Sequence, residues 1–156
     1  MVSDLDVRLT GLEGAMQDLT PVYQKDVHQI FMDMEKRHFA TEGAHAGVQF
    51  VPLNPGYAAW KAKQLEGSRP ILQFTTRMYA SLAFEGSSDH VVRVGPSFAE
   101  YGTRVPWARH HQFGTKKMPK RLVIPPLTKA EGERIVDAIL IHVIKGLRGE
   151  KRSVRK

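Results

Sequence analysis

Apolar residues recur every three or four positions in three parts of the chain, and this spacing predicts helices. The first part covers residues 5–19, and the second covers residues 23–34, after Thr20-Pro21. We expect a short first helix and a second from about 21 to 38, with a break or kink at Pro21 and Thr20 as the N-cap. The third pattern predicts a helix in "TKAEGERIVDAILIHVIKG", where Thr128 and Glu131 match the S/T-x-x-E capping box.

Shorter elements are predicted between these helices. "NPGYAAWKAKQLEG" indicates a helix capped by Asn54 and ended by Gly67, and one or two helical turns are expected at Thr76–Ala83. "WARHHQFG" predicts a short helix that ends at Gly114. Residues 39–56 carry no sustained period and predict a long loop with a short extended piece at 48–51, and long loops are usually functional or ordered by a partner.

Two stretches are typical of β-strands. "HVVRVGP" alternates in the way a strand does, and Ala83–Glu85 is its expected partner across the turn "GSSD". "RLVIPP" reads as a short strand stopped by two prolines. Together the elements predict an α+β domain with N-terminal helices, a small antiparallel sheet and a C-terminal helix packed on the sheet. We expect one domain at residues 1–147 and a basic tail at residues 148–156.

The C-terminal helix is apolar on two sides. One stripe consists of Ile135, Ile139 and Val143, and the other consists of Val136, Leu140 and Ile144. Two stripes imply burial on two sides, of which one is the core of the chain itself. The second side is covered either by a neighbouring subunit or by the same core, and the pattern leaves both interpretations open.

The composition narrows the class of protein. A chain of 156 residues suits a single core, and no apolar run approaches the roughly 18 residues that span a membrane, so no membrane partner is expected. The sequence contains no cysteine, which excludes disulfides and thiolate chemistry and suits assembly in a reducing cytoplasm. The N-terminus lacks the basic-then-apolar pattern of a signal peptide, which argues against export.

The net charge of +7 is concentrated in one internal segment and in the C-terminal tail. Residues 100–127 hold six cationic residues and one glutamate, and the cations are interleaved with Trp107 and Phe113. Such a segment favours anionic partners and has the composition for phosphate contacts and base stacking, although no known nucleic-acid-binding motif is present. A small nucleic-acid-binding protein is therefore one hypothesis. Its candidate contacts include Arg104, Lys120, Arg148, Lys151 and Arg152.

The sequence gives little support for catalysis, and we expect neither an enzyme nor a cofactor. No serine lies in a G-x-S-x-G elbow, and no phosphate-binding glycine loop is present. His110 and His111 are adjacent, so on a helix they point about 100° apart and cannot ligate one metal from the same face. A metal hydrolase built on His38, Glu42, His45 and the His110-His111 pair is a third hypothesis.

The order of motifs from residue 50 to 127 adds a resemblance. "ILQFTTRMYASLAFE" is followed by a valine-rich strand ending "VGPSFAEYG", then by "PWARHHQFGT" and "MPKRLVIPPL". This succession, over roughly residues 48–146, resembles the phage virion morphogenesis family of tail-completion proteins in Mu-like and P2-like phages. Its most specific element is His111-Gln112-Phe113-Gly114. The chain departs from the family pattern at Thr76, where glycine is typical, and at Lys120, within the Pro-Lys-Arg triplet.

The resemblance implies a structural virion protein at the neck or upper tail, assembled in the host cytoplasm. Related neck proteins form rings, commonly of six subunits, between the head connector and the tail, around the DNA channel. Expected partners are therefore other copies of the chain, the connector or stopper, the tail terminator, the tail tube and possible DNA in the lumen. The residues expected to contact protein partners are Trp107, Arg109, His111, Phe113, Lys116, Lys117 and Arg121, with Val136, Leu140 and Ile144 on the helix.

Overall fold

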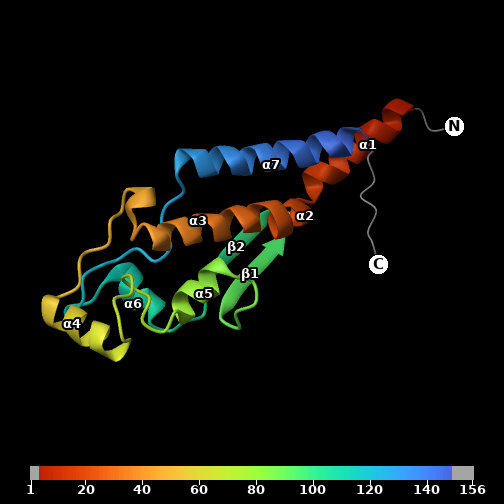
Figure 1. The fold of residues 1–156 in the computed structure, drawn as a ribbon. Helices are drawn as coiled ribbons and strands as arrows, with labels where there is room; N and C mark the ends of the chain where they lie inside the picture. The colour runs from red at the N-terminus through yellow and green to blue at the C-terminus, as the bar shows by residue number, and fades with distance from the viewer. Residues whose placement is uncertain (1–3, 149–156) are drawn as a thin grey trace. The chain divides into compact units, whose positions relative to one another are not determined.

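The computed structural model of the protein describes residues 4–148 (Figure 1). Its internal contacts form two compact units. Unit 1 contains the described residues of segments 1–30, 93–100 and 129–156, and unit 2 contains residues 31–92 and 101–128. Within the described residues, no helix is long and apolar enough to cross a membrane.

Unit 1 is built on two helices that lie side by side, α1 (Asp4–Gln17) and α7 (Lys129–Leu147) (Figure 1). They approach closely because both have glycine at the contact. A Cβ added at Gly146 would lie 2.7 Å from the carbonyl oxygen of Gly11 and would also collide with the Ala15 side chain. The most extensive contacts of α7 are therefore with α1, rather than with the sheet on which the sequence had placed it.

The predicted break between the first two helices exists, but it precedes Pro21. Helix α2 (Thr20–Val22) continues through a π-helical turn, η1 (Tyr23–Val27), into α3 (His28–Ala40). The expected Thr20 cap is wrong, because Leu19 occupies the N-cap position and its side chain caps nothing. The Asp18 carboxylate accepts the Thr20 backbone N–H at 2.9 Å instead. Hydrogen bonding to the Thr20 side chain, and then to its backbone, holds the pKa of Asp18 below its usual value.

In unit 2 the predicted loop is partly ordered by a short 3-10 helix, η2 (Ala44–Ala46), and leads into α4 (Pro55–Gln64). The Asn54 cap is confirmed, since its side chain accepts the Gly56 N–H at 2.9 Å. Helix α5 (Arg77–Ala83) confirms the helical turns expected at this place. Thr76 precedes α5 with φ 57°, a left-handed conformation that glycine adopts without strain, which explains why glycine is typical there.

The sheet is a hairpin of β1 (His90–Gly95) and β2 (Phe98–Thr103). The first strand is confirmed, but its expected partner at Ala83–Glu85 is wrong, because Ala83 is the buried last residue of α5. The true partner follows after only two residues, a connection that closes a hairpin with little loss of chain entropy.

Helix α6 (Ala108–Phe113) is confirmed, including its end at Gly114. The predicted strand "RLVIPP" is wrong, because residues 121–126 have no strand partner among the described residues. The side chain of Gln112 binds the backbone of this segment in place of a neighbouring strand. With its helices and one small sheet, the chain confirms the α+β class.

The core of unit 2 is formed by the apolar side of α3 and by side chains from α5, α6 and the segment after α6. Phe39 lies at its centre, with ring centroids 5.3 Å from Tyr79 and 6.3 Å from Phe50. The buried cluster consists of Phe31, Met32, Met34, Phe39, Met78, Leu82, Val105, Ala108 and Val123.

Candidate interaction site

The motif His111-Gln112-Phe113-Gly114 shapes the chain between α6 and the segment that follows. Gly114 has φ 75°, and a Cβ added there would lie 3.1 Å from the Lys120 backbone nitrogen. Glycine suits this left-handed backbone conformation, and any side chain there would also crowd the Lys120 backbone. The chain then folds back, and the Arg121 N–H donates to the His111 carbonyl at 2.8 Å.

Gln112 holds the returning chain in place. Its side-chain oxygen accepts the N–H groups of Val123 at 2.7 Å and Ile124 at 2.9 Å. Its side-chain nitrogen donates to the Ile124 carbonyl at 3.1 Å. One amide therefore satisfies three backbone groups that would otherwise need a strand or water.

The Arg121 side chain is buried in unit 2 and binds backbone carbonyl groups there. It is 6% exposed, and its guanidinium donates to the carbonyl oxygens of Val51 at 2.7 Å and Pro52 at 3.1 Å. The sequence had suggested Arg121 as a contact for a partner protein. In the folded chain its polar atoms instead join the loop before α4 to the segment after α6.

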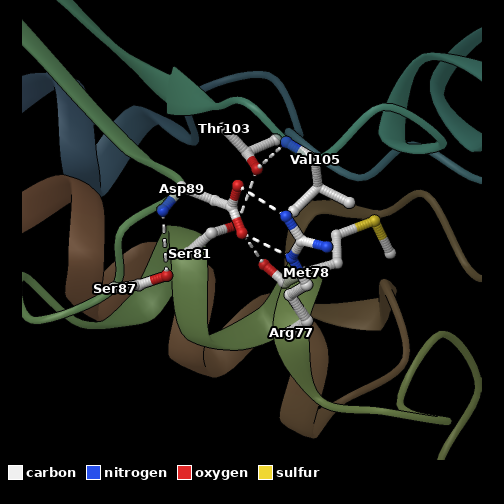
Figure 2. Close-up of polar contacts among 7 residues, drawn as sticks. All are labelled: Arg77, Met78, Ser81, Ser87, Asp89, Thr103 and Val105. Carbon is white, nitrogen blue, oxygen red and sulfur yellow. Dashed lines mark hydrogen bonds and ion pairs between the residues drawn. The ribbon is translucent and has the colours of Figure 1, made fainter.

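Trp107 is positioned by a polar network that the sequence did not reveal. The Arg77 guanidinium binds the Asp89 carboxylate through Nε at 2.5 Å and through a second nitrogen at 2.9 Å (Figure 2). The same guanidinium lies 5.3 Å from the centre of the Trp107 ring, which remains 38% exposed. The pair holds the pKa of Asp89 below its usual value, so this carboxylate is charged and fixed.

Hydrogen bonds of serine and threonine continue this network (Figure 2). The Ser81 hydroxyl donates to the Met78 carbonyl and lies 2.6 Å from the Thr103 hydroxyl, which accepts the Val105 N–H at 3.0 Å. The backbone of Arg104 donates to the Asp89 carbonyl at 2.8 Å. The beginning of the 104–121 segment is thus tied to α5 and to Asp89, the residue before β1.

These elements enclose a groove of about 530 Å³ within unit 2, which we call the basic groove. Its lining contains three cationic side chains and no aspartate or glutamate. Phe74 in its wall is stacked on Trp60, with ring centroids 5.6 Å apart. The lining residues are Leu53, Asn54, Tyr57, Lys61, Leu72, Phe74, Thr75, Met78, Trp107, His111, Lys117, Met118 and Arg121.

The cations of the basic groove differ in their exposure to solvent and in their hydrogen-bond partners. Lys61 is 3% exposed, and its ammonium donates to the carbonyl oxygens of Arg69 at 3.1 Å and Pro70 at 2.6 Å. Burial lowers the pKa of Lys61, while the Glu42 carboxylate opposes that effect. Lys117 is exposed, so it is the lining cation best placed to meet an anionic partner.

His111 is a neutral side chain at this site. Burial lowers its pKa, and the positive charge of Arg121 lowers it further. A neutral imidazole in an apolar wall suits packing against a partner better than it suits proton transfer. Among the other metal candidates, His38 is fully buried, with Nε2 2.7 Å from the Leu122 carbonyl. In the described part of the chain, no group of three or more such side chains could hold a metal ion.

A second surface lies on α7 in unit 1, and we call it the α7 outer face. It consists of Val136, Leu140 and Ile144, which are 55%, 51% and 45% exposed, respectively. The other predicted stripe, which consists of Ile135, Ile139 and Val143, is partly buried. The two stripes therefore differ in exposure, and the outer one carries large aliphatic side chains at the surface.

The remaining predicted residues lie mostly at the surface. Phe113 is 77% exposed, the most exposed large apolar side chain described in the chain. Lys151 and Arg152 lie outside the described residues. Besides Lys117, the predicted contact residues include five exposed cations: Arg104, Arg109, Lys116, Lys120 and Arg148.

Comparison with known proteins gives the family. The sequence model of the phage virion morphogenesis family matches residues 2–143. Searches of curated proteins and of solved structures found no match. Because the family match covers nearly the whole chain, the protein belongs to the phage virion morphogenesis family and is a structural protein of bacteriophage assembly.

Proposed function

We propose that this chain is a tail-completion or neck protein, a ring subunit that joins the head connector to the tail around the DNA channel. The α7 outer face carries this proposal, because it leaves three large aliphatic residues about half exposed on one helix of a virion protein. Contiguous apolar patches of this kind usually mark interfaces between proteins. In the assembled particle, a neighbouring subunit covers them.

The free energy available from this face is substantial. Full burial of a Val, Leu or Ile side chain contributes roughly 1.5–3 kcal/mol relative to full exposure. Since the three residues are about half exposed, covering them contributes on the order of 3 kcal/mol per interface. A ring multiplies this contribution by the number of its interfaces, so a modest pairwise contact supports a stable closed assembly.

The test is a charge placed in the α7 outer face, with a matched change on another side of the helix. Leu140→Glu leaves the fold intact, because the residue is half exposed, but it buries a carboxylate in the interface and abolishes the ring. Lys145→Glu is the control, since it is also exposed and lies about 140° around the helix from Leu140.

Two measurements decide the outcome. Light scattering and electron microscopy of the purified protein report the ring, and complementation of a phage that lacks the protein reports particle assembly. We expect rings and infectious particles with wild type and Lys145→Glu, but monomers and no joined particles with Leu140→Glu. A wild-type protein that is monomeric at all concentrations and absent from purified particles refutes the proposal.

A second candidate function is supported by the exposed cations of the 104–120 segment. Nucleic-acid binding through Arg104, Arg109, Lys116, Lys117 and Lys120 has an affinity that falls steeply as salt rises. Fluorescence anisotropy with duplex and single-stranded DNA measures it. Absence of binding at low salt removes this function and leaves the ring proposal untouched.

A further inference from the structure

We propose that the basic groove of one subunit receives the α7 outer face of the next subunit in the ring. This inference rests on the proposed function, because it assigns the two surfaces through which the ring closes. The groove lies within unit 2 and the helix face within unit 1, so each copy offers both halves of the contact.

The helix has the form that a groove of this kind accepts. Val136, Leu140 and Ile144 are spaced four residues apart, so they project from one side of α7 along about 12 Å of its axis. An amphipathic helix docks in an apolar groove through anchors with this spacing. No further folding is needed, because α7 is already formed.

The groove offers matching chemistry. Tyr57, Phe74, Met78, Trp107 and Met118 line it with aromatic and methionine side chains. Such side chains give large contact area and adjust to aliphatic anchors. Its volume of about 530 Å³ lies within the roughly 300–1,000 Å³ of typical ligand pockets.

The charges of the two surfaces are complementary. Asp137 is exposed on the α7 outer face, and Glu133, also exposed, lies 3.8 Å from the Lys129 ammonium, which offsets its charge. The groove lining contains Lys117, which is exposed, and no carboxylate. The Asp137 carboxylate brought near the Lys117 ammonium favours one direction of docking and disfavours the reverse.

Ring closure distinguishes this pairing from contact between two copies of α7. Two identical faces form an isologous contact, which is satisfied in a dimer and does not propagate. A ring of more than two subunits with one kind of interface needs two different surfaces on each copy. The basic groove and the α7 outer face are two such surfaces.

The sequence offers a direct test because it contains no cysteine. Thr75→Cys places a thiol in the groove lining, at an exposed residue, and Leu140→Cys places one on the α7 outer face. The two variants are made as separate full-length chains with tags of different size, mixed, assembled and oxidised. Any disulfide between them joins different subunits and requires Cα atoms within about 7 Å.

Matched controls use thiols that are equally accessible but lie elsewhere. Ser88→Cys is exposed and outside the groove lining, and Lys145→Cys is exposed on another side of α7. We expect the Thr75→Cys and Leu140→Cys mixture to give at least about fivefold more cross-linked heterodimer than either control mixture, because disulfide geometry is restrictive.

The possible results separate this inference from the proposed function. Rings that form while the heterodimer yield stays at the control level overturn the groove pairing and leave the ring intact. Rings in which Leu140→Cys cross-links only to itself also overturn it, since the helix faces then pair with each other. Wild-type chains that never assemble refute the ring, and the groove pairing fails with it.

Discussion

Removal of the Gln112 side chain tests whether the family motif acts through this amide. Gln112→Ala deletes the acceptor of the Val123 and Ile124 N–H groups and the donor to the Ile124 carbonyl. Val123 is 1% exposed, so water reaches this region poorly. We expect the segment after α6 to detach and unit 2 to lose stability.

The magnitude follows from the three hydrogen bonds. A buried polar group left without a partner costs about 1–3 kcal/mol. Ile124 is only partly buried, so water replaces part of what its two groups lose. The expected loss in the free energy of unfolding is therefore about 3 kcal/mol, a large part of the roughly 5–15 kcal/mol typical of a domain.

Gln112→Glu separates the contribution of the two accepted hydrogen bonds from that of the donated one. The carboxylate keeps an acceptor for both N–H groups, but it cannot donate to the Ile124 carbonyl and places two acceptors about 3.1 Å apart. We expect a loss smaller than that of Gln112→Ala, on the order of 1–2 kcal/mol. The order of stability is then wild type, Gln112→Glu, Gln112→Ala.

Urea unfolding followed by circular dichroism measures these differences, with tryptophan fluorescence as a second probe in unit 2. Gln64→Ala is the control, because Gln64 is exposed near the end of α4 and its loss is expected to stay within about 0.5 kcal/mol. If Gln112→Ala is as stable as Gln64→Ala, the amide does not hold the segment and the role assigned to the motif is wrong.

Three further changes test other parts of the fold by urea unfolding. Thr76→Gly should stabilise the chain by about 0.5–1 kcal/mol, because φ is 57° there, and no gain would contradict the strain. Asp89→Asn should flatten the loss of stability as pH falls below about 4, the usual pKa of an aspartate. The lowered pKa of Asp89 means that its carboxylate stabilises the fold at higher pH and ceases to do so as pH falls through that pKa. Gly146→Ala should lower the free energy of unfolding by about 1–3 kcal/mol, because its Cβ meets Ala15. Gly132→Ala lies in open space on the same helix and should raise the free energy of unfolding by about 0.5–1 kcal/mol. Equal effects of the two variants would refute the close helix contact.

Local signals predicted the helical elements well. Asn54-Pro55 marks the start of α4, and Gly114 marks the end of α6, because caps and glycine stops act over a few residues. The helical period also separated the two sides of α7, of which the outer one is exposed. Such features depend on neighbours within one or two turns, which a single sequence displays.

Features that depend on distant residues were missed. Arg121 binds carbonyl groups at Val51 and Pro52, about seventy positions earlier, and its charge had suggested a surface role. The segment after α6 has the apolar character of a strand, but a glutamine side chain provides its hydrogen bonds. The lining of the basic groove comes from segments that meet only in the folded chain.

The 107–121 segment combines side chains that hold its shape with side chains that remain available. Gln112 and Arg121 bind the backbone of their own unit, while Phe113 and Lys117 are exposed. A partner that meets an already ordered surface bears less of the entropy cost of binding. Variants at Gln112 should therefore weaken assembly as well as folding, whereas variants at Lys117 should weaken assembly alone. This difference separates positioning residues from contact residues within one short motif.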